Sequence, residues 1–325
     1  MPAPTLANSS AHAEERDDDN DSTFSGRASS FSTLSSEALN YEWKYGRSYH
    51  GYRAGRYWFP NDETEQHRLD LVHNAFLNAL DGRLILAPIN PHGVRILDVG
   101  TGTGIWAIHV ADEHPGAEVR GSDLSPIQPD MVPPNVEFFV DDVEQEWLGQ
   151  PYGFIHCRNL AGAIEDWPQL VGQIYDNLIP GGWIELQGFV NVAYSERGEL
   201  PSDDPLVRLM AGLKEAGDFN RREMNPVPLF KDWVEAAGFM RVKEERVKIP
   251  IGLWPKNENL RTAGGFMAAS YRLGIGGITA VPFRDNLGWS AAEVEVFNVE
   301  VRAAVYRTDA RYYFEFISVI GQKPN

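Results

Sequence analysis

The chain has 325 residues, enough for one large domain or two modest ones, and 43% of them are hydrophobic, which supports a substantial core. Its formal net charge of −17 argues against nucleic acid and against an anionic membrane surface as partners, because both contacts need a basic face. One cysteine, Cys157, excludes an internal disulfide and is typical of a reducing compartment. No apolar run approaches the roughly 18 residues that span a bilayer. We therefore expect a soluble protein of the cytoplasm or nucleus.

Residues 1–38 are predicted to be a disordered tail that precedes a single domain over residues 39–325. The tail is rich in Ser, Ala, Asp and Glu, and such a segment cannot bury enough apolar surface to offset the entropy of ordering it. Its serines could be phosphorylated, but a solvated spacer is the simpler interpretation.

Residues 39–90 are expected to form a helical lid and a first helix. The stretch Tyr41–Phe59 is aromatic and basic. Aromatic side chains interleaved with Arg could stack on single-stranded nucleic acid, but the acidity of the chain favours a packed lid or a wall of a substrate site. Asp62 lies in an N-cap signal, and apolar residues between Leu69 and Leu80 recur on one face of the helix that follows.

The chain is organised around one turn. A buried strand is predicted to end at Val99, and glycines follow at positions 100, 102 and 104 before a helical pattern starts at Ile105. Glycine lets the backbone turn sharply and approach a ligand closely. The free N–H groups of the helix that begins there would point at the ligand. The turn therefore predicts a nucleotide-type site, although a purely structural tight turn would use the same glycines.

Strands and helices alternate after this turn. Strands are predicted over residues 118–122, 135–140, 154–157 and 183–187, with a helix over 170–178. Such alternation indicates a parallel sheet with helices on both faces, and we assign residues 91–193 to a cofactor-binding core.

Residues 194–325 are expected to supply the remaining strands and a helical insertion. The strands are predicted over 239–249 and 312–320, and helices over 204–216, 229–237, 260–273 and 291–306. The stretch between Pro250 and Arg311 is too long for a simple connection, so we place a helical insertion there, on the substrate side of the ligand crevice.

Two classes of cofactor use such a turn. A dinucleotide fingerprint needs Gly or Ala where this chain has Ile105, and a pyrophosphate would lie close to Asp98. A sulfonium conjugate of methionine and adenosine carries an ammonium and a carboxylate instead, so an acid at the strand end becomes useful. Asp123 ends the second strand, where a carboxylate can accept both ribose hydroxyls, and Asp142-Val143 follows the third, within reach of an adenine. The alternative for these acids is solvated loop positions or helix N-caps.

The segment 97–104 resembles the first motif of class I S-adenosylmethionine-dependent methyltransferases, with Asp123 and Asp142-Val143 as the second and third. Residues 45–50, 122–129 and 162–167 are similar to the fungal LaeA-like (UMTA-type) members of that family. The resemblance implies a Rossmann-like, seven-stranded α/β sheet with an antiparallel last strand, and S-adenosylmethionine (SAM) as cofactor. The family is associated with fungal secondary metabolism, including global regulators and pathway enzymes.

The cofactor site is predicted from the three motifs and the end of the fourth strand. Arg158 could contact the methionine part of SAM there, or could equally pair with Glu165 or Asp166. No cluster of His, Cys and Asp has the spacing of a metal site. The residues expected to bind SAM are Asp98, Gly100, Thr101, Gly102, Gly104, Asp123, Leu124, Asp142, Val143 and Arg158.

Methyl transfer from a sulfonium does not require a catalytic side chain. Alignment of the two reactants can supply most of the acceleration, with effective molarities of ~10⁵–10⁸ M. A general base adds about 10²–10⁴-fold, and only where the nucleophile must lose a proton. The candidates for that base are His156, His50 and Tyr49. His156 could instead point into a neighbouring helix, and Tyr49 and His50 could serve only to pack the lid.

We expect a SAM-dependent methyltransferase that acts on a small secondary metabolite at O, N or C. Methylation of a protein is a rival, because the acidic surface could attract basic tails. A regulatory subunit that works through protein partners is another. A closed aromatic cavity beside the cofactor would favour a small acceptor, and an exposed groove would favour a peptide.

Overall fold

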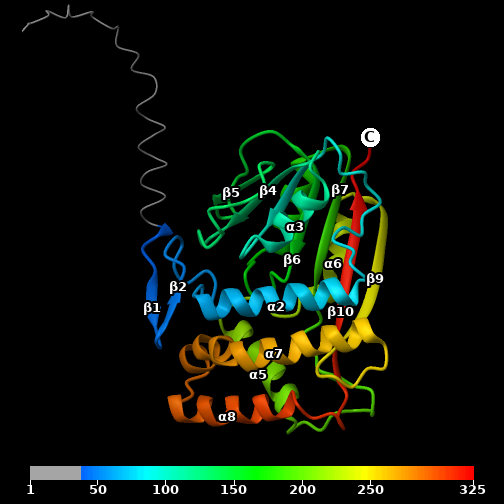
Figure 1. Ribbon diagram of the computed structural model, residues 1–325. Helices are drawn as coiled ribbons and strands as arrows, with labels where there is room; N and C mark the ends of the chain where they lie inside the picture. Colours follow the sequence, from blue (N-terminus) through cyan, green and yellow to red (C-terminus); the bar gives the residue numbers. More distant parts are fainter. Residues whose placement is uncertain (1–37) are drawn as a thin grey trace, which may run out of the picture.

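The computed structural model describes residues 38–325 (Figure 1). The tail predicted for residues 1–38 therefore lies outside the described residues, apart from Ala38. The rest of the chain forms one α/β unit around a single large sheet, with the carboxyl end of the chain on its last strand (Figure 1).

Among the described residues, eight strands form this sheet. β10 pairs antiparallel with β7 on one side and with β9 on the other, and the short β8 pairs with the first residues of β10. The α/β sheet with an antiparallel last strand is thus confirmed, and β8 is added to the seven strands expected. In spatial order the strands are β5 (Val136–Val140), β4 (Glu118–Asp123), β3 (Arg95–Val99), β6 (Tyr152–Arg158), β7 (Leu178–Phe189), β10 (Tyr312–Gln322) and β9 (Met240–Pro250), with β8 (Tyr194–Ser195) beside β10.

The strand order reverses at β3. The chain runs outward from β3 to β4 and β5, then returns to the other side of β3 as β6, and all these pairings are parallel. In open parallel sheets, ligands bind outside the carboxyl ends of the strands at such a reversal. The topology therefore places a ligand crevice at the turn that follows β3.

Both faces of the central strands are covered by helices. Successive side chains of a strand point to opposite faces, so apolar residues of these strands must be buried on both sides of the sheet. Ile96 and Phe154 face α3 (Ile105–Glu113) and pack with its buried Trp106. Leu97 and Ile155 face the other side, where α4 (Trp167–Asp176) and α6 (Phe230–Ala236) pack. The prediction of a doubly covered parallel sheet is confirmed.

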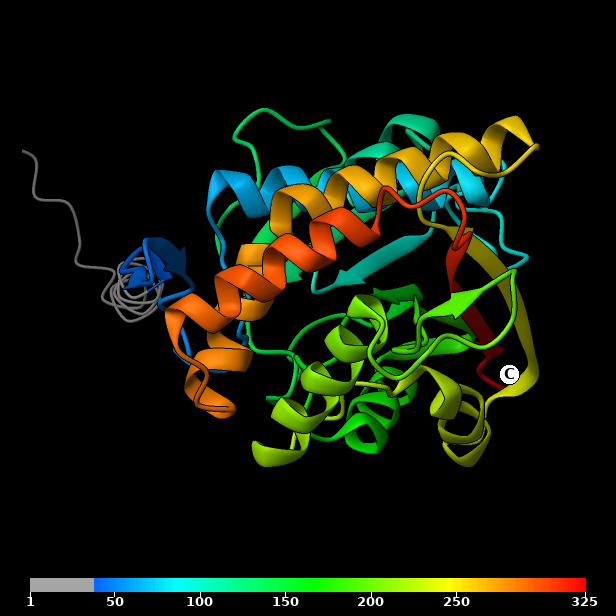
Figure 2. The same cartoon turned by 90° about the horizontal axis from the view of Figure 1, so that it is seen from below.

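A separate layer of helices packs at one end of the sheet. α2, α7 and α8 run alongside one another (Figures 1 and 2), and α5 packs against α8. None of the helices between residues 38 and 325 is long and apolar enough to cross a bilayer. The layer comprises α2 (Glu63–Ala79), α5 (Pro205–Phe219), α7 (Glu258–Val281), the π-helical turn η2 (Pro282–Asn286) and α8 (Ala291–Ala304), whereas the 3-10 turn η1 (Val227–Leu229) packs against α6 and β7.

The first part of the lid is a β-hairpin instead of the helix expected. β1 (Glu42–Lys44) pairs antiparallel with β2 (Arg47–Tyr49) through a two-residue turn. Tyr45 and Gly46 adopt φ of 53° and 73°, and positive φ at both central residues gives a turn whose twist matches that of the two strands. Only α2, behind the hairpin, is helical.

Asp62 joins the hairpin to α2. Its Oδ1 accepts hydrogen bonds from the backbone N–H of Glu65, at 3.0 Å, and from Nη2 of Arg47, at 2.7 Å. Burial raises the pKa of the Asp62 carboxyl, but the hydrogen bonds from Arg47 and Glu65 outweigh it and the pKa is lowered overall. The carboxylate thus acts both as the N-cap of α2 and as the anchor of β2.

We expect Asp62→Ala to lower the free energy of unfolding by about 1 kcal/mol through loss of the cap, measured by urea denaturation at neutral pH. Because the folded-state pKa is lowered, the difference should be full above about pH 5 and should shrink as the pH falls through and below about 4. Asp62→Asn, which keeps the cap, should lose less. An equal loss in the exposed neighbour Thr64→Ala would contradict this role.

Candidate functional site

The turn after β3 is held in a conformation that favours glycine. Gly100, Gly102 and Gly104 have φ of 64°, 59° and 79°. A Cβ on Gly104 would also collide with the ring of Phe138. Gly104 is the N-cap of α3 and carries no side chain, so the first N–H groups of the helix are left to face the crevice. The turn thus offers backbone donors and close access to a ligand.

Asp98 lies buried beneath this turn, and both of its carboxylate oxygens are engaged. Oδ2 accepts from the Thr101 hydroxyl at 2.6 Å, and Oδ1 lies 2.7 Å from Nδ1 of His156. Nε2 of His156 faces Oε1 of Gln187 at 3.4 Å, while the Gln187 amide donates to Glu185. Both ring nitrogens of His156 are therefore engaged by neighbouring side chains.

His156 is therefore a supporting residue of the site. It is fully buried and stacks on the indole of Trp106, with ring centroids 3.8 Å apart. With both nitrogens engaged by Asp98 and Gln187, neither is free to take a proton from a methyl acceptor in this arrangement. The position of His156 thus corresponds to the alternative expected from the sequence, in which the side chain packs against a helix.

A pocket opens above Asp98 at the carboxyl ends of β3, β4, β5 and β6, with a volume of about 1240 Å³ including its mouth. We call it the strand-end pocket. Its walls come from the turns after these strands, from α2 and from the lid. Of the residues predicted to bind the cofactor, those that line it are Asp98, Gly100, Thr101, Gly102, Asp123, Asp142, Val143, Leu124 and Arg158. Gly104 lies just behind, at the start of α3.

Asp123 occupies the middle of the pocket. Its Oδ2 accepts from the N–H of Gly102 at 2.8 Å and its Oδ1 from the N–H of Ser125 at 2.9 Å. Burial raises the pKa of this carboxyl, while the two backbone hydrogen bonds lower it and partly offset the effect. The carboxylate is thereby fixed in direction, with lone pairs left to accept from a ligand.

Asp142 marks one end of the pocket. It is 4% exposed, and its Oδ1 accepts from the N–H of Glu144 at 3.1 Å. Its Oδ2 is buried without a hydrogen-bond partner among the described residues, although the Arg53 guanidinium lies 3.6 Å away. A buried carboxylate oxygen that accepts no hydrogen bond lowers the stability of the fold, and a hydrogen-bond donor on a ligand would offset that loss.

Arg158 marks the opposite end. Its Nη2 donates to Nδ1 of His73 at 2.9 Å, and its guanidinium lies over the ring of Phe76. Burial lowers the pKa of Arg158 to about 10, so it remains a cation at neutral pH. The alternative partners Glu165 and Asp166 are wrong: within residues 38–325, Glu165 pairs with Arg56 and Arg222. The Arg158 cation thus lines the pocket, and its hydrogen-bond partner, His73, is neutral.

His73 is neutral in this arrangement. Burial and the neighbouring Arg158 lower the pKa of His73 to about 2. Since Nδ1 accepts from Arg158, the proton lies on Nε2, which donates to Nδ1 of His109 at 2.9 Å. Two imidazoles thus hold the Arg158 guanidinium in place without neutralising it.

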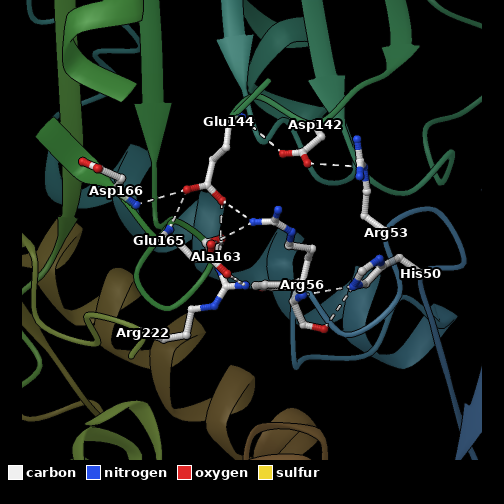
Figure 3. Close-up of polar contacts among 10 residues, drawn as sticks. His50, Arg53, Arg56, Asp142, Glu144, Ala163, Glu165, Asp166 and Arg222 are labelled. Atoms are coloured by element: carbon white, nitrogen blue, oxygen red, sulfur yellow. Dashed lines mark hydrogen bonds and ion pairs between the residues drawn. The ribbon is translucent and has the colours of Figure 1, made fainter. Parts of the chain in front are cut away.

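The lid is fastened over the pocket by a charged clasp (Figure 3). Arg56 of the lid bonds Glu144 at 3.1 Å and Glu165 at 3.2 Å, and Arg222 reaches the second oxygen of Glu165 at 2.8 Å. Glu144 also accepts from the backbone N–H groups of Glu165 and Asp166. We call Arg56, Glu144, Glu165 and Arg222 the lid clasp.

The two lid candidates for catalysis lie in different places. His50 lines the strand-end pocket, but its Nδ1 bonds the carbonyl of Tyr52 at 2.7 Å and its Nε2 accepts from the N–H of Tyr57 at 3.0 Å. It therefore closes the lid loop upon itself. Tyr49 is buried in the core and does not line the pocket as the structure describes it, and burial raises its pKa to about 12. The position of Tyr49 gives no support to a catalytic role, which stays a prediction.

Several lining residues were not predicted from the sequence. Tyr57 and Arg56 lie in the aromatic segment, whose direction of packing a sequence does not specify. His73 was not among the predicted site residues. It shares a helix face with Leu69, Val72 and Phe76, and this face lines the pocket, which was the one available signal.

The comparisons with known proteins decide the family. A family model described as a methyltransferase domain matches residues 71–243. A protein named methyltransferase pytC, from Aspergillus terreus, is 50% identical over 298 residues, covering 91% of this chain and 92% of that protein. The chain belongs to this methyltransferase family. The resemblance predicted from the sequence is confirmed, and this methyltransferase uses SAM as its methyl donor.

More distant relatives are named as a regulator and as a protein-methionine methyltransferase. The secondary metabolism regulator LAE1 of Cochliobolus heterostrophus is 37% identical, over 75% of this chain and 82% of that protein. A protein-methionine methyltransferase laeA of Emericella nidulans is 33% identical, over 86% of this chain and 75% of that protein. The fungal LaeA-like kinship expected from the lid and loop motifs is thus confirmed.

We expect Arg56→Ala to loosen the lid of this methyltransferase, because it removes two of the contacts of the lid clasp. Hydrogen exchange of the backbone amides in residues 51–57 should rise by up to about fivefold, the scale of a partly exposed ion pair. Arg246→Ala, which removes a similar pair of bridges on β9, is the matched control. Unchanged exchange in the lid of Arg56→Ala would show that other contacts hold it.

Proposed function

We propose that SAM binds in the strand-end pocket and that its methyl group passes to a small-molecule acceptor of secondary metabolism. One observation carries the proposal. The pocket presents a buried carboxylate oxygen that accepts no hydrogen bond from any described residue, Asp142 Oδ2, at one end and a half-buried cation bonded to a neutral imidazole, Arg158, at the other. SAM carries an amino group on adenine at one end and a carboxylate on methionine at the other, so the two match.

The roles of the lining residues follow from this orientation. Asp142 would accept from the adenine amino group, and Val143 and Leu124 would contact the ring. Asp123, held by Gly102 and Ser125, would accept both ribose hydroxyls. The glycine turn lets the backbone approach the methionine part, and Arg158 would bind its carboxylate with charge-assisted hydrogen bonds.

His156 would act as a positioning residue. It holds Asp98 beneath the turn, and Asp98 in turn holds Thr101. The negative charge of Asp98 would also favour the ammonium of the methionine part. No proton transfer by His156 or His50 is part of the proposal, because the ring nitrogens of both are engaged with neighbouring groups.

The chemistry needs alignment more than a catalytic group. The sulfonium of SAM supplies an activated leaving group when bound. The residues of this chain bind and orient it, and the lid excludes water from above. The buried, reduced Cys157 fits a cytoplasmic or nuclear location, which remains part of the proposal.

A small-molecule acceptor is favoured over a regulatory or protein-directed role. The relative named simply as a methyltransferase is 50% identical, whereas those named as regulators are 33–37% identical and the one named as a protein-methionine methyltransferase is 33% identical. Nine of the ten predicted cofactor residues line one pocket, which supports cofactor binding. A role through protein partners stays the alternative.

Arg158→Gln tests whether Arg158 binds the methionine part of the ligand and not its adenosine part. We expect the variant to bind S-adenosylhomocysteine about tenfold or more weakly than the wild-type protein, because a charge-assisted pair is lost. Its affinity for 5′-methylthioadenosine, which lacks the amino acid, should be unchanged. Calorimetry measures both.

Arg221→Gln, on the exposed loop after α5, is the matched control and should alter neither affinity. If Arg158→Gln weakened both ligands equally, the side chain would be structural. If it weakened neither, the assignment of Arg158 to the methionine carboxylate would be wrong.

A further inference from the structure

A second pocket, of about 1040 Å³ including its mouth, adjoins the strand-end pocket. We propose that it binds the methyl acceptor, and that this acceptor is an uncharged, largely apolar ring molecule that carries carbonyl or ether oxygens. The inference rests on the proposed function and deepens it by assigning a substrate class. We call this second pocket the apolar chamber.

The two pockets meet along a shared wall. Tyr57 of the lid, Leu69 and Val72 of α2, and Asn159 and Leu160 after β6 line both of them. The chamber lies on the Arg158 side of that wall, where the methionine part of SAM is assigned. A molecule in the chamber would therefore face the sulfonium end of the cofactor and not its adenine.

The chamber is lined mainly by apolar and aromatic side chains that come from the lid, from α2, α5 and α7, and from the strands β7 and β10. Among them are Phe59, Phe189, Met210, Leu213, Met267 and Phe314. Such a lining stabilises apolar ligand surface by about 25 cal/mol per Å² removed from water. A ring molecule would also find aromatic faces to pack against.

The chamber carries no net charge. Arg68 is the one charged residue on its wall within the described part of the chain, and its Nε and Nη2 bond Oε1 of the buried Glu65 at 2.9 and 2.7 Å. The ion pair is thus neutral as a whole. A charged acceptor would lose its hydration without gaining an opposite charge. A lysine- or arginine-rich peptide, which would need acidic walls, is disfavoured for the same reason.

Two half-buried phenols supply the polar contacts. Tyr57 and Tyr271 line the chamber, and neither hydroxyl forms a hydrogen bond with any residue between 38 and 325. Burial raises the pKa of both phenols, so both keep their protons at neutral pH. Each therefore has a hydroxyl that can donate to a carbonyl or ether oxygen of a ligand in place of water.

The test uses a matched pair of probes with the full-length protein saturated with S-adenosylhomocysteine. 6-Acetyl-2-naphthol is neutral and carries a ketone, and 6-hydroxy-2-naphthoate has nearly the same shape but carries a carboxylate. Fluorescence titration should show saturable binding of the ketone, about tenfold or more tighter than that of the carboxylate.

Variants locate the probe. Tyr271→Phe should weaken the ketone by about threefold to tenfold, the effect of one lost hydrogen bond, and Ala161→Phe should block the chamber. The exposed Tyr306→Phe is the control and should change nothing. None of the three should alter the affinity for S-adenosylhomocysteine, because none of these residues lines the strand-end pocket.

The outcomes separate the two proposals. Failure of the wild-type protein to bind S-adenosylhomocysteine would overturn the proposed function itself. Normal binding of S-adenosylhomocysteine, together with no saturable binding of the ketone, would overturn only the chamber assignment. So would equal affinity for the two probes, an unchanged affinity in Tyr271→Phe, or displacement of the ketone by a lysine-rich peptide.

Discussion

The site depends on one buried polar contact, that between Asp98 and His156. A carboxylate beneath the turn must be fully hydrogen-bonded, because an unpaired buried charge is strongly destabilising. Thr101 and His156 meet that need, and His156 is itself held by Trp106 and by the Gln187–Glu185 pair, whose carboxylate also accepts from the backbone N–H groups of residues 86 and 87. One polar chain thus ties together three strands, α3 and the connection before β3, and it fixes the floor of the pocket before any ligand arrives.

The roof is held in a different way. The lid rests on the lid clasp and on the loop closed by His50, and most of these contacts are partly exposed to solvent. Partly exposed ion pairs contribute little individually, so the roof can open at a cost far below that of unfolding the floor. Methyl transfer by alignment requires a rigid pocket floor that orients the reactants. It also requires a lid that can open to admit the substrate and release the products.

Local patterns in the sequence predicted the sheet, the glycine turn and the family, because each is encoded within a few neighbouring residues. The hairpin of the lid was missed because aromatic content does not distinguish a packed helix from a packed strand, although Tyr45-Gly46 matches a two-residue turn. The engagement of Arg158 with His73 was missed because 85 positions separate the two residues. The apolar chamber was unpredictable for the same reason, since α2, α5, α7 and β10 meet there only in the folded chain. The assignments of SAM-binding residues remain predictions.

Calorimetric titration of S-adenosylhomocysteine into the wild-type protein and into Asp123→Asn tests whether the strand-end pocket binds SAM. We predict saturable binding at one site in the wild-type protein. We predict about tenfold or more weaker binding in Asp123→Asn, because the ribose hydroxyls would lose a charged acceptor. Asp130→Asn, an exposed acid on the loop that follows Asp123, should bind as the wild-type protein does. Absence of binding to the wild-type protein would contradict the assignment of SAM to this pocket, and undiminished binding to Asp123→Asn would contradict the role of Asp123 in holding the ribose.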